Sequence, residues 1–400
     1  PFRIETRIPD DFPLPPDGLN IRWPDPPLVQ EARLLDYKWY AGLAYVRANK
    51  LDRVVLDAPQ ARFGIMTAGK AYLDVRQALV DLGLDEETCR RIGIRLYKVG
   101  CVWPLEAHGA RAFAEGLQEI LVVEEKRQIL EYQLKEELYN YRDDVRPRVY
   151  GKFDEKDHAG GEWSVPMANW LLPAHYELSP ALIARAIATR LEKFELPSDV
   201  RARIASRIAI IDAKEKALAR PRVTAERKPW FCSGCPHNTS TNVPEGSRAL
   251  AGIGCHYMTV WMDRRTDTFS QMGGEGVAWI GQMPFSGDQH VFANLGDGTY
   301  YHSGYLAIRQ AIAAKANITY KILYNDAVAM TGGQTVGERP EGHTVIQIMN
   351  SVISEGVKKL VIVTDEPAKY TGVALAPGVD LYQGSWSVTL IRQDDGVLVL

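Results

Sequence analysis

The chain has 400 residues, 24% of which are charged, and its formal net charge is -3 at pH 7. This length exceeds what one ordinary hydrophobic core holds, so we expect two or three α/β domains. The nearly balanced charge argues against a general affinity for nucleic acid, and no apolar run approaches the length of a membrane span.

The N-terminal part predicts a strap followed by a first α/β domain. Residues 1–52 open with a proline-rich stretch, which favours an extended strap, and continue in an amphipathic helix over 28–51. Over 53–150, short apolar strands alternate with helices, and this alternation indicates βαβ units with a parallel sheet. The strands are predicted at 62–67, 93–99, 119–124 and 146–150, and the helices at 70–82, 109–117 and 126–139.

Residues 151–230 are predicted as a linker, irregular at first and then helical. Ser179 suits an N-cap with Pro180 at the first helical position, and a basic stretch at 220–230 is the clearest domain boundary. A second α/β domain is expected over 231–400. Its strands are predicted near 249–253, 291–295, 319–324 and 360–364, with a helix over 345–355 and one or two further strands over 379–400.

The cysteine content favours a reducing compartment, and we expect a cytoplasmic protein. There are five cysteines, and an odd number without a visible secretion signal argues against a disulfide framework. The chain begins with Pro1 and ends on a strand-like run, so we expect both ends to be cuts through a longer polypeptide.

The strongest chemical signal lies in residues 294–334. A short apolar strand runs into Gly296, Asp297 and Gly298, and apolar residues then recur at helical spacing. The two glycines let backbone amides approach a phosphate at a helix N-terminus, and Asp297 supplies a hard oxygen ligand. The turn therefore predicts a diphosphate site.

A second apolar strand ends at Asn325. If the two strands are neighbours in a parallel sheet, Asp297 and Asn325 lie at adjacent carboxyl ends, where such sheets bind ligands. Their oxygens, a backbone carbonyl from about Ala327 and two diphosphate oxygens would complete an octahedral magnesium shell. The spacing resembles the thiamine diphosphate signature.

Three cysteines form a second constellation in the same domain. Cys232 and Cys235 are three positions apart and can hold one edge of a metal or cluster, and Cys255 follows on a glycine-rich stretch. The candidates are a [4Fe-4S] cluster, a zinc site completed by His237 or His256, and a dithiol redox pair. We favour the cluster, because an electron acceptor suits a neighbouring diphosphate cofactor. Its fourth ligand would come from beyond the last residue, from another chain or from a non-cysteine group.

Long motifs around these residues strongly resemble the fused type of indolepyruvate ferredoxin oxidoreductase, within the thiamine diphosphate-dependent 2-oxoacid:ferredoxin oxidoreductase family. The motifs span 231–258, 271–282, 296–304 and 320–334, and shorter ones at 19–25, 64–75, 102–106 and 122–126 resemble the transketolase C-terminal-like domain of that family. The resemblance implies two parallel-sheet domains, transketolase-like and thiamine diphosphate-binding, with helices on both faces.

The resemblance also implies roles for individual residues. The magnesium ligands would be Asp297, Asn325 and the Ala327 carbonyl. The diphosphate would be surrounded by Gly296, Gly298, Thr331, Gly332 and Gln334. The proximal [4Fe-4S] cluster would be held by Cys232, Cys235 and Cys255. The thiazolium would be bordered by Ile253, Gly254 and His256, with the loop at 273–276 and His302 nearby.

The implied reaction is oxidative decarboxylation of an aryl 2-oxoacid such as indolepyruvate to an acyl-CoA, with electrons passing through the cluster to ferredoxin. A homodimer is expected, and the activating glutamate is expected in a pyrimidine-binding domain which, like the gamma-type domain, lies outside this chain. No catalytic residue is therefore assigned, and the chain alone is expected to be inactive. The alternatives are a non-oxidative thiamine diphosphate decarboxylase or synthase, and a zinc-stabilised, non-catalytic assembly module.

Overall fold

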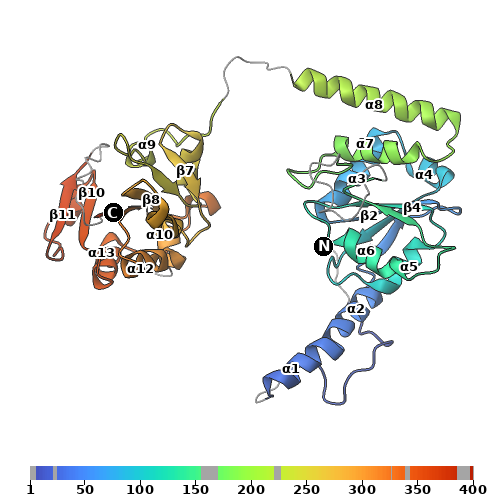
Figure 1. Cartoon of the computed structure of the whole chain (residues 1–400), viewed down its shortest axis with the longest axis horizontal. Coiled ribbons are helices and arrows are strands. Elements are labelled where there is room, and N and C mark those ends of the chain that lie inside the picture. The colour runs from blue at the N-terminus through green and yellow to red at the C-terminus, as the bar shows by residue number, and fades with distance from the viewer. Residues whose placement is uncertain are drawn as a thin grey trace. The chain divides into compact units, whose positions relative to one another are not determined.

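The computed structural model describes residues 6–20, 25–154, 170–219, 227–325, 327–337 and 343–384, and the backbone of 397–399. The chain divides into two compact units, Pro1–Arg222 and Val223–Leu400. Each unit is an α/β structure built on a largely parallel sheet (Figure 1). The predicted fold class is therefore confirmed, and each unit is described by itself.

The first unit contains a five-stranded sheet in the order β1-β3-β2-β4-β5. The strands β2 to β5 run parallel, as predicted, whereas β1 was not expected and pairs antiparallel with β3 at the edge. The bounds are β1 (Arg53–Leu56), β2 (Phe63–Ala68), β3 (Ile94–Val99), β4 (Glu119–Val123) and β5 (Arg148–Tyr150).

Helices cover both faces of this sheet. Because side chains alternate along a strand, Phe63 and Ile65 of β2 pack with α3, α4 and α7, whereas Met66 packs with α5 and α6. The predicted helix at 28–51 is present as α1, a π-helical turn η1 and α2 in succession. The bounds are α1 (Pro27–Arg33), η1 (Leu34–Lys38), α2 (Trp39–Ala48), α3 (Gly69–Asp81), α4 (Glu86–Ile92), α5 (Ala107–Ala114), α6 (Leu130–Tyr139), α7 (Pro180–Leu191) and α8 (Ser198–Leu218).

The start of α6 differs from the predicted helix at 126–139. The helix begins at Leu130 because the side chain of Glu124, at the end of β4, caps it from upstream. Its carboxylate accepts hydrogen bonds from the backbone N–H groups of Ile129, Leu130 and Glu131 at 2.9, 2.9 and 3.0 Å. A side chain five to seven residues upstream thus sets a boundary that helix periodicity does not reveal.

The helix α7, expected within a linker over 151–230, packs into the core of the first unit. Ser179 caps it as predicted, and Ile183 and Ile187 are fully buried in the cluster on the α3 face of the sheet. At its end, Arg190 forms a buried two-bond ion pair with Glu119 of β4, with both distances 2.6 Å. The helix belongs to the first unit because its apolar face covers that sheet; part of the predicted irregular stretch, 155–169, lies outside the described residues.

The second unit contains a seven-stranded parallel sheet in the order β11-β10-β12-β9-β8-β6-β7. The four predicted strands β6, β8, β9 and β10 are present, the one or two further strands expected over 379–400 are β11 and β12, and β7 was not expected. The bounds are β6 (Ala249–Ala251), β7 (Thr266–Phe269), β8 (Val291–Gly296), β9 (Ile318–Leu323), β10 (Lys359–Thr364), β11 (Val379–Gln383) and β12 (Val397–Val399).

The two faces of this second sheet are covered differently. Val291, Ala293 and Leu295 of β8 pack on one face with α10, α12 and α13, and the short segments α9 and η3 contact the sheet through β9, β8 and β6. The bounds are α9 (His237–Ser240), η3 (Cys255–Trp261), α10 (Val277–Gln282), η4 (Met283–Phe285), α11 (Asp297–Thr299), η5 (Tyr300–Gly304), α12 (Tyr305–Ala313), η6 (Ala329–Thr331), α13 (Val345–Ser354) and η7 (Pro367–Tyr370). None of the described helices combines the length and the apolar character that a membrane span requires.

Candidate cofactor-binding site

The carboxyl ends of β8 and β9 bring Asp297 and Asn325 together. The two strands are parallel neighbours, with Gly296 opposite Leu323, so the predicted adjacency is confirmed. The backbone N–H of Asn325 donates to Asp297 Oδ2 at 2.9 Å, and the N–H of Gly298 donates to Asp297 Oδ1 at 2.8 Å. These bonds fix a buried carboxylate, only 4% exposed, at the start of α11.

Asn325 presents its side chain at the surface beside this carboxylate. Its Oδ1 accepts a hydrogen bond from the backbone N–H of Ala327 at 3.2 Å, which ties the side chain to the next turn. A carboxylate, an amide oxygen and a nearby backbone carbonyl are all hard oxygen donors, the ligand chemistry that Mg²⁺ prefers when phosphate oxygens complete its shell. The residues present therefore fit a magnesium–diphosphate group.

A loop closes over the glycine turn. A Cβ added to Gly298 would lie 3.1 Å from Val328 Cγ2, so the turn and the loop are in close contact. Val328 in turn pairs with Gln334, whose carbonyl accepts from the Val328 N–H at 2.9 Å, and Gln334 Nε2 donates to Thr331 Oγ1 at 2.7 Å. Gly332, with φ 126°, allows this reversal. The predicted diphosphate residues of the loop are thus linked to the turn.

His256 lies against the glycine turn from the other side. A Cβ on Gly296 would be 3.5 Å from His256 Cε1, and one on Gly254 would be 2.7 Å from the same atom. The imidazole is 2% exposed, and its Nε2 has no hydrogen-bond partner among the described residues. Burial, and secondarily the neighbouring His237, lower the pKa of His256 to about 4, so the ring is neutral at pH 7. A buried ring nitrogen is therefore available beside the turn.

Ile253 and His302 are less enclosed. Ile253 is 37% exposed, and His302 is exposed with its Nδ1 3.0 Å from the hydroxyl oxygen of Ser303. That hydroxyl lies against the loop at 273–276, because a Cβ on Gly273 would come within 2.4 Å of it. The structure thus places the turn that carries His302 beside this loop.

Glu275 was not identified from the sequence, although it lies in the loop at 273–276. The side chain is fully buried, Oε2 accepts from the Gly273 N–H at 2.7 Å, and Oε1 has no partner among the described residues. Its backbone carbonyl accepts from the Tyr320 hydroxyl at 3.0 Å, and a Cβ on Gly252 would lie 2.4 Å from its side chain. Burial raises the pKa of the Glu275 carboxyl. A charged residue between glycines was the only sequence signal.

The three cysteines of the second unit share one neighbourhood. Cys232 and Cys235 flank a tight turn in which the Cys235 N–H donates to the Cys232 carbonyl at 3.1 Å, and Cys235 Sγ lies 3.4 Å from His237 Nδ1. Burial raises the pKa of the Cys255 thiol, and the nearby thiols of Cys235 and Cys232 raise it further. In the part of the chain that the structure describes, however, no three His, Cys, Asp or Glu side chains are grouped so that they could hold a metal ion. The thiols of Cys232 and Cys235 nevertheless lie near that of Cys255.

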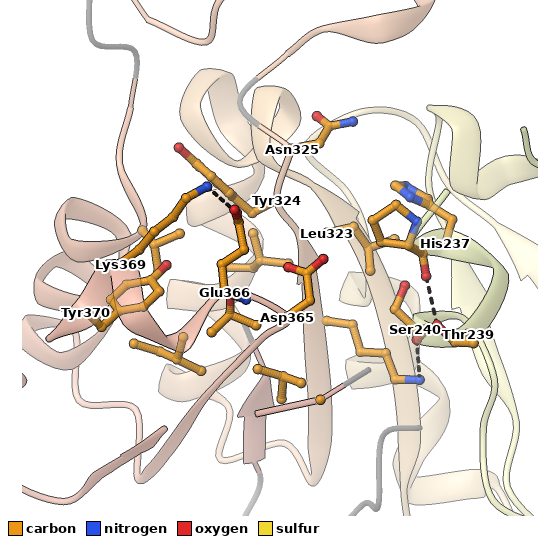
Figure 2. Close-up of a pocket in the computed structure, with 18 of the residues that line it drawn as sticks. His237, Thr239, Ser240, Leu323, Tyr324, Asn325, Asp365, Glu366, Lys369 and Tyr370 are labelled. Atoms are coloured by element: carbon orange, nitrogen blue, oxygen red, sulfur yellow. Dashed lines mark hydrogen bonds and ion pairs between the residues drawn. The ribbon is translucent and has the colours of Figure 1, made fainter. Parts of the chain in front are cut away.

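A cavity of about 680 Å³ opens at the carboxyl ends of β9 and β10. Figure 2 shows His237 and Ser240 on one wall, Glu366 and Lys369 on the other, and Asn325 between them. Lys369 and Glu366 form an ion pair, and Asp365 beside them leaves this wall with a net negative charge. The cavity therefore extends from the proposed cation ligand Asn325 to the segment that follows the cysteine pair.

Two domain families match this fold and site. Residues 252–383 match the family described as "Thiamine pyrophosphate enzyme, C-terminal TPP binding domain". Residues 52–221 match "Indolepyruvate ferredoxin oxidoreductase middle domain". The second unit is thus similar to the cofactor domain of thiamine diphosphate enzymes, and the first unit is similar to the middle domain of indolepyruvate ferredoxin oxidoreductase.

The curated relatives agree with these matches. The chain is 28% identical over 304 residues to "Indolepyruvate oxidoreductase subunit IorA" of Thermococcus kodakarensis, covering 70% of this chain and 41% of that protein. The protein of the same name from Pyrococcus abyssi is 28% identical over 310 residues, covering 72% and 42%. The matched part of this chain thus spans less than half the length of these relatives.

Among solved structures, a 2-oxoglutarate:ferredoxin oxidoreductase from Magnetococcus marinus matches 44% of this chain and 65% of its own, at 18% identity and a TM-score of 0.31.

Proposed function

We propose that this chain is part of a thiamine diphosphate-dependent oxidoreductase that oxidatively decarboxylates an aryl 2-oxoacid of the indolepyruvate type. The product would be an acyl-CoA, and electrons would pass through an iron–sulfur cluster to ferredoxin. The observation that carries the proposal is the β8–β9 register, which joins Asp297 to Asn325 at one sheet edge. The names of the relatives support the substrate class.

The magnesium–diphosphate group would be held by the residues at this edge. Asp297, Asn325 and the Ala327 carbonyl would bind the cation, and Gly296 and Gly298 would let the phosphates approach the N-terminus of the helical run from Asp297 to Ala313. Thr331, Gly332 and Gln334 would close the loop over the diphosphate. When bound, thiamine diphosphate supplies a carbon nucleophile for the 2-oxo group and an acceptor for the electrons left by carbon dioxide.

The remaining residues of the site would orient the substrate and exclude water. His256 is buried and neutral beside Gly296, so its free Nε2 can exchange a hydrogen bond with a reacting group without adding a charge. Ile253 provides a partly exposed apolar surface on the same loop. His302 would lie at the edge of the site.

Cys232, Cys235 and Cys255 would hold the [4Fe-4S] cluster that takes the electrons. Their proximity supports this role, since the neighbouring thiols raise the pKa of Cys255 and a bound metal would favour its thiolate. One observation favours a second candidate, a zinc-stabilised module that is not catalytic: His237 Nδ1 lies 3.4 Å from Cys235 Sγ, and imidazole with thiolates is a zinc ligand set.

Metal analysis with optical spectroscopy separates the two candidates. We expect the full chain, purified without oxygen, to contain iron and labile sulfide and to show a broad brown absorption that dithionite bleaches. Stoichiometric zinc in a colourless protein would instead support the structural module. Isothermal titration with thiamine diphosphate, in Mg²⁺ and then in EDTA, tests the cofactor independently; no binding in either would contradict the proposal.

A further inference from the structure

A buried lysine lies beneath the segment that carries the cysteine pair. Lys321, on β9, is 2% exposed, and its Nζ donates to the backbone carbonyls of Ser240 at 3.0 Å and Asn242 at 2.5 Å. Among the described residues, no carboxylate forms an ion pair with it. Burial lowers its pKa to about 7, with no acidic neighbour to oppose the shift.

Burying a lysine costs free energy, because the side chain loses its hydration. The contacts of Lys321 therefore indicate what the side chain does. Its Nζ also lies 5.1 Å from the centre of the Phe292 ring, which holds the side chain on the β8–β9 face that α9 contacts. The two carbonyls that it binds lie at and just beyond the end of α9, where a cation is favoured by unpaired carbonyl groups. An apolar side chain of similar length would satisfy neither carbonyl.

The position of Lys321 connects the cysteine segment with the proposed diphosphate site. The helix α9 begins two residues after Cys235, so the lysine fixes the segment that directly follows the cysteine pair. On its own strand, Lys321 is four residues before Asn325, at the edge that carries the proposed magnesium ligands. One side chain therefore ties the cysteine segment to the strand that leads to the diphosphate site.

We propose that Lys321 is a positioning residue that holds the Cys232–Cys235 segment, and with it the group bound by those thiols, against β9. The inference rests on the proposed function only in the identity of that group. The anchoring itself rests on the hydrogen bonds of Lys321 to Ser240 and Asn242.

Hydrogen exchange measures the anchoring without any bound cofactor. Lys321→Met in the full 400-residue chain should raise exchange about tenfold at the amides of Thr239, Ser240 and Asn242, which bond to carbonyls within this segment. Amides of α12 should be unchanged. Lys315→Met, on the exposed surface of the same unit, is the matched control. Equal protection in Lys321→Met and wild type would overturn the anchoring.

The reduction potential measures whether the anchoring positions the bound group. In iron–sulfur-loaded protein, Lys321→Met should shift the midpoint potential, because the cysteine segment is no longer held against β9, and Lys321→Arg, which keeps the donors, should restore it. If Lys321→Met is insoluble, Lys321→Leu, which also lacks a donor, replaces it in both measurements.

The two proposals fail in different ways. A wild-type protein without a cluster would contradict the proposed function, while the exchange experiment would still test the anchor. A wild-type cluster whose potential is the same in Lys321→Met would contradict the role of Lys321 alone.

Discussion

Replacing Asp297 is the most direct test of the cofactor site. Its carboxylate accepts backbone N–H groups of Gly298 and Asn325 at 2.8 and 2.9 Å and is 4% exposed. Hydrogen bonds to a charged group contribute about 1.5–3 kcal/mol each, and both amides belong to residues that partly reach solvent, so we take the lower end. Asp297→Ala should therefore reduce the free energy of unfolding of the second unit by about 3 kcal/mol, a loss that urea titration measures.

The effect on cofactor binding should be larger than the effect on stability. Asp297→Ala removes the only charged protein ligand proposed for magnesium, so calorimetric titration with thiamine diphosphate and Mg²⁺ should detect no binding. Asp297→Asn keeps the size and one oxygen but places an NH₂ group against a backbone donor, and it should also lose magnesium-dependent binding. Wild-type affinity in Asp297→Ala would refute the assignment.

A surface aspartate of the same unit provides the control. Asp288 pairs with Arg248 at 2.6 Å on a partly exposed face. Exposed pairs contribute about 0–1 kcal/mol, so Asp288→Ala should change stability by less than 1 kcal/mol and leave thiamine diphosphate affinity unchanged. A similar loss of affinity in both variants would show that the effect is not specific to the site.

Three further predictions follow from close contacts and burial. Gly298→Ala should weaken thiamine diphosphate binding about tenfold in the same titration with little loss of stability, because the new Cβ lies 3.1 Å from Val328 Cγ2 and the loop must shift. Glu275→Gln should stabilise the second unit by about 1 kcal/mol at pH 8 but not at pH 4. Burial raises the pKa of the Glu275 carboxyl, so the protonated side chain contributes its full stability below pH 4.5, and this contribution is lost as the pH rises through the pKa of the folded state. An equal change in unfolding free energy at both pH values would contradict this reasoning. Arg190→Met should lower the unfolding free energy of the first unit by about 3–5 kcal/mol, since it leaves the Glu119 carboxylate buried without its partner, while thiamine diphosphate affinity stays unchanged.

Features set by local sequence were predicted well. The strand before Gly296, the helix after it and the strand before Asn325 are all present, because apolar periodicity and glycine at a turn are local properties. The adjacency of Asp297 and Asn325 could be expected as well, since consecutive βαβ strands commonly pair in parallel. That expectation followed from the general rule for the pairing of βαβ strands.

Features that depend on distant partners were not predicted. No local pattern links Lys321 to Ser240 and Asn242, which lie 81 and 79 residues away. Glu275 was expected only as part of a loop, yet it is fully buried against Gly252. In the same way, α7 packs in the first unit because its apolar face covers the sheet of that unit. No pattern within residues 151–230 specifies this contact.

The sequence by itself determined the chemistry available: hard oxygens at Asp297 and Asn325, glycines that admit a phosphate, and three thiols in one domain. Those are properties of residue type and short spacing. Tertiary structure decided which groups meet and how they are held. The β8–β9 ladder fixed the Asp297 carboxylate with two backbone amides, and packing of the cysteine segment against β9 buried a lysine beneath it. Distances across a sheet follow from strand pairing and burial, which the whole fold sets.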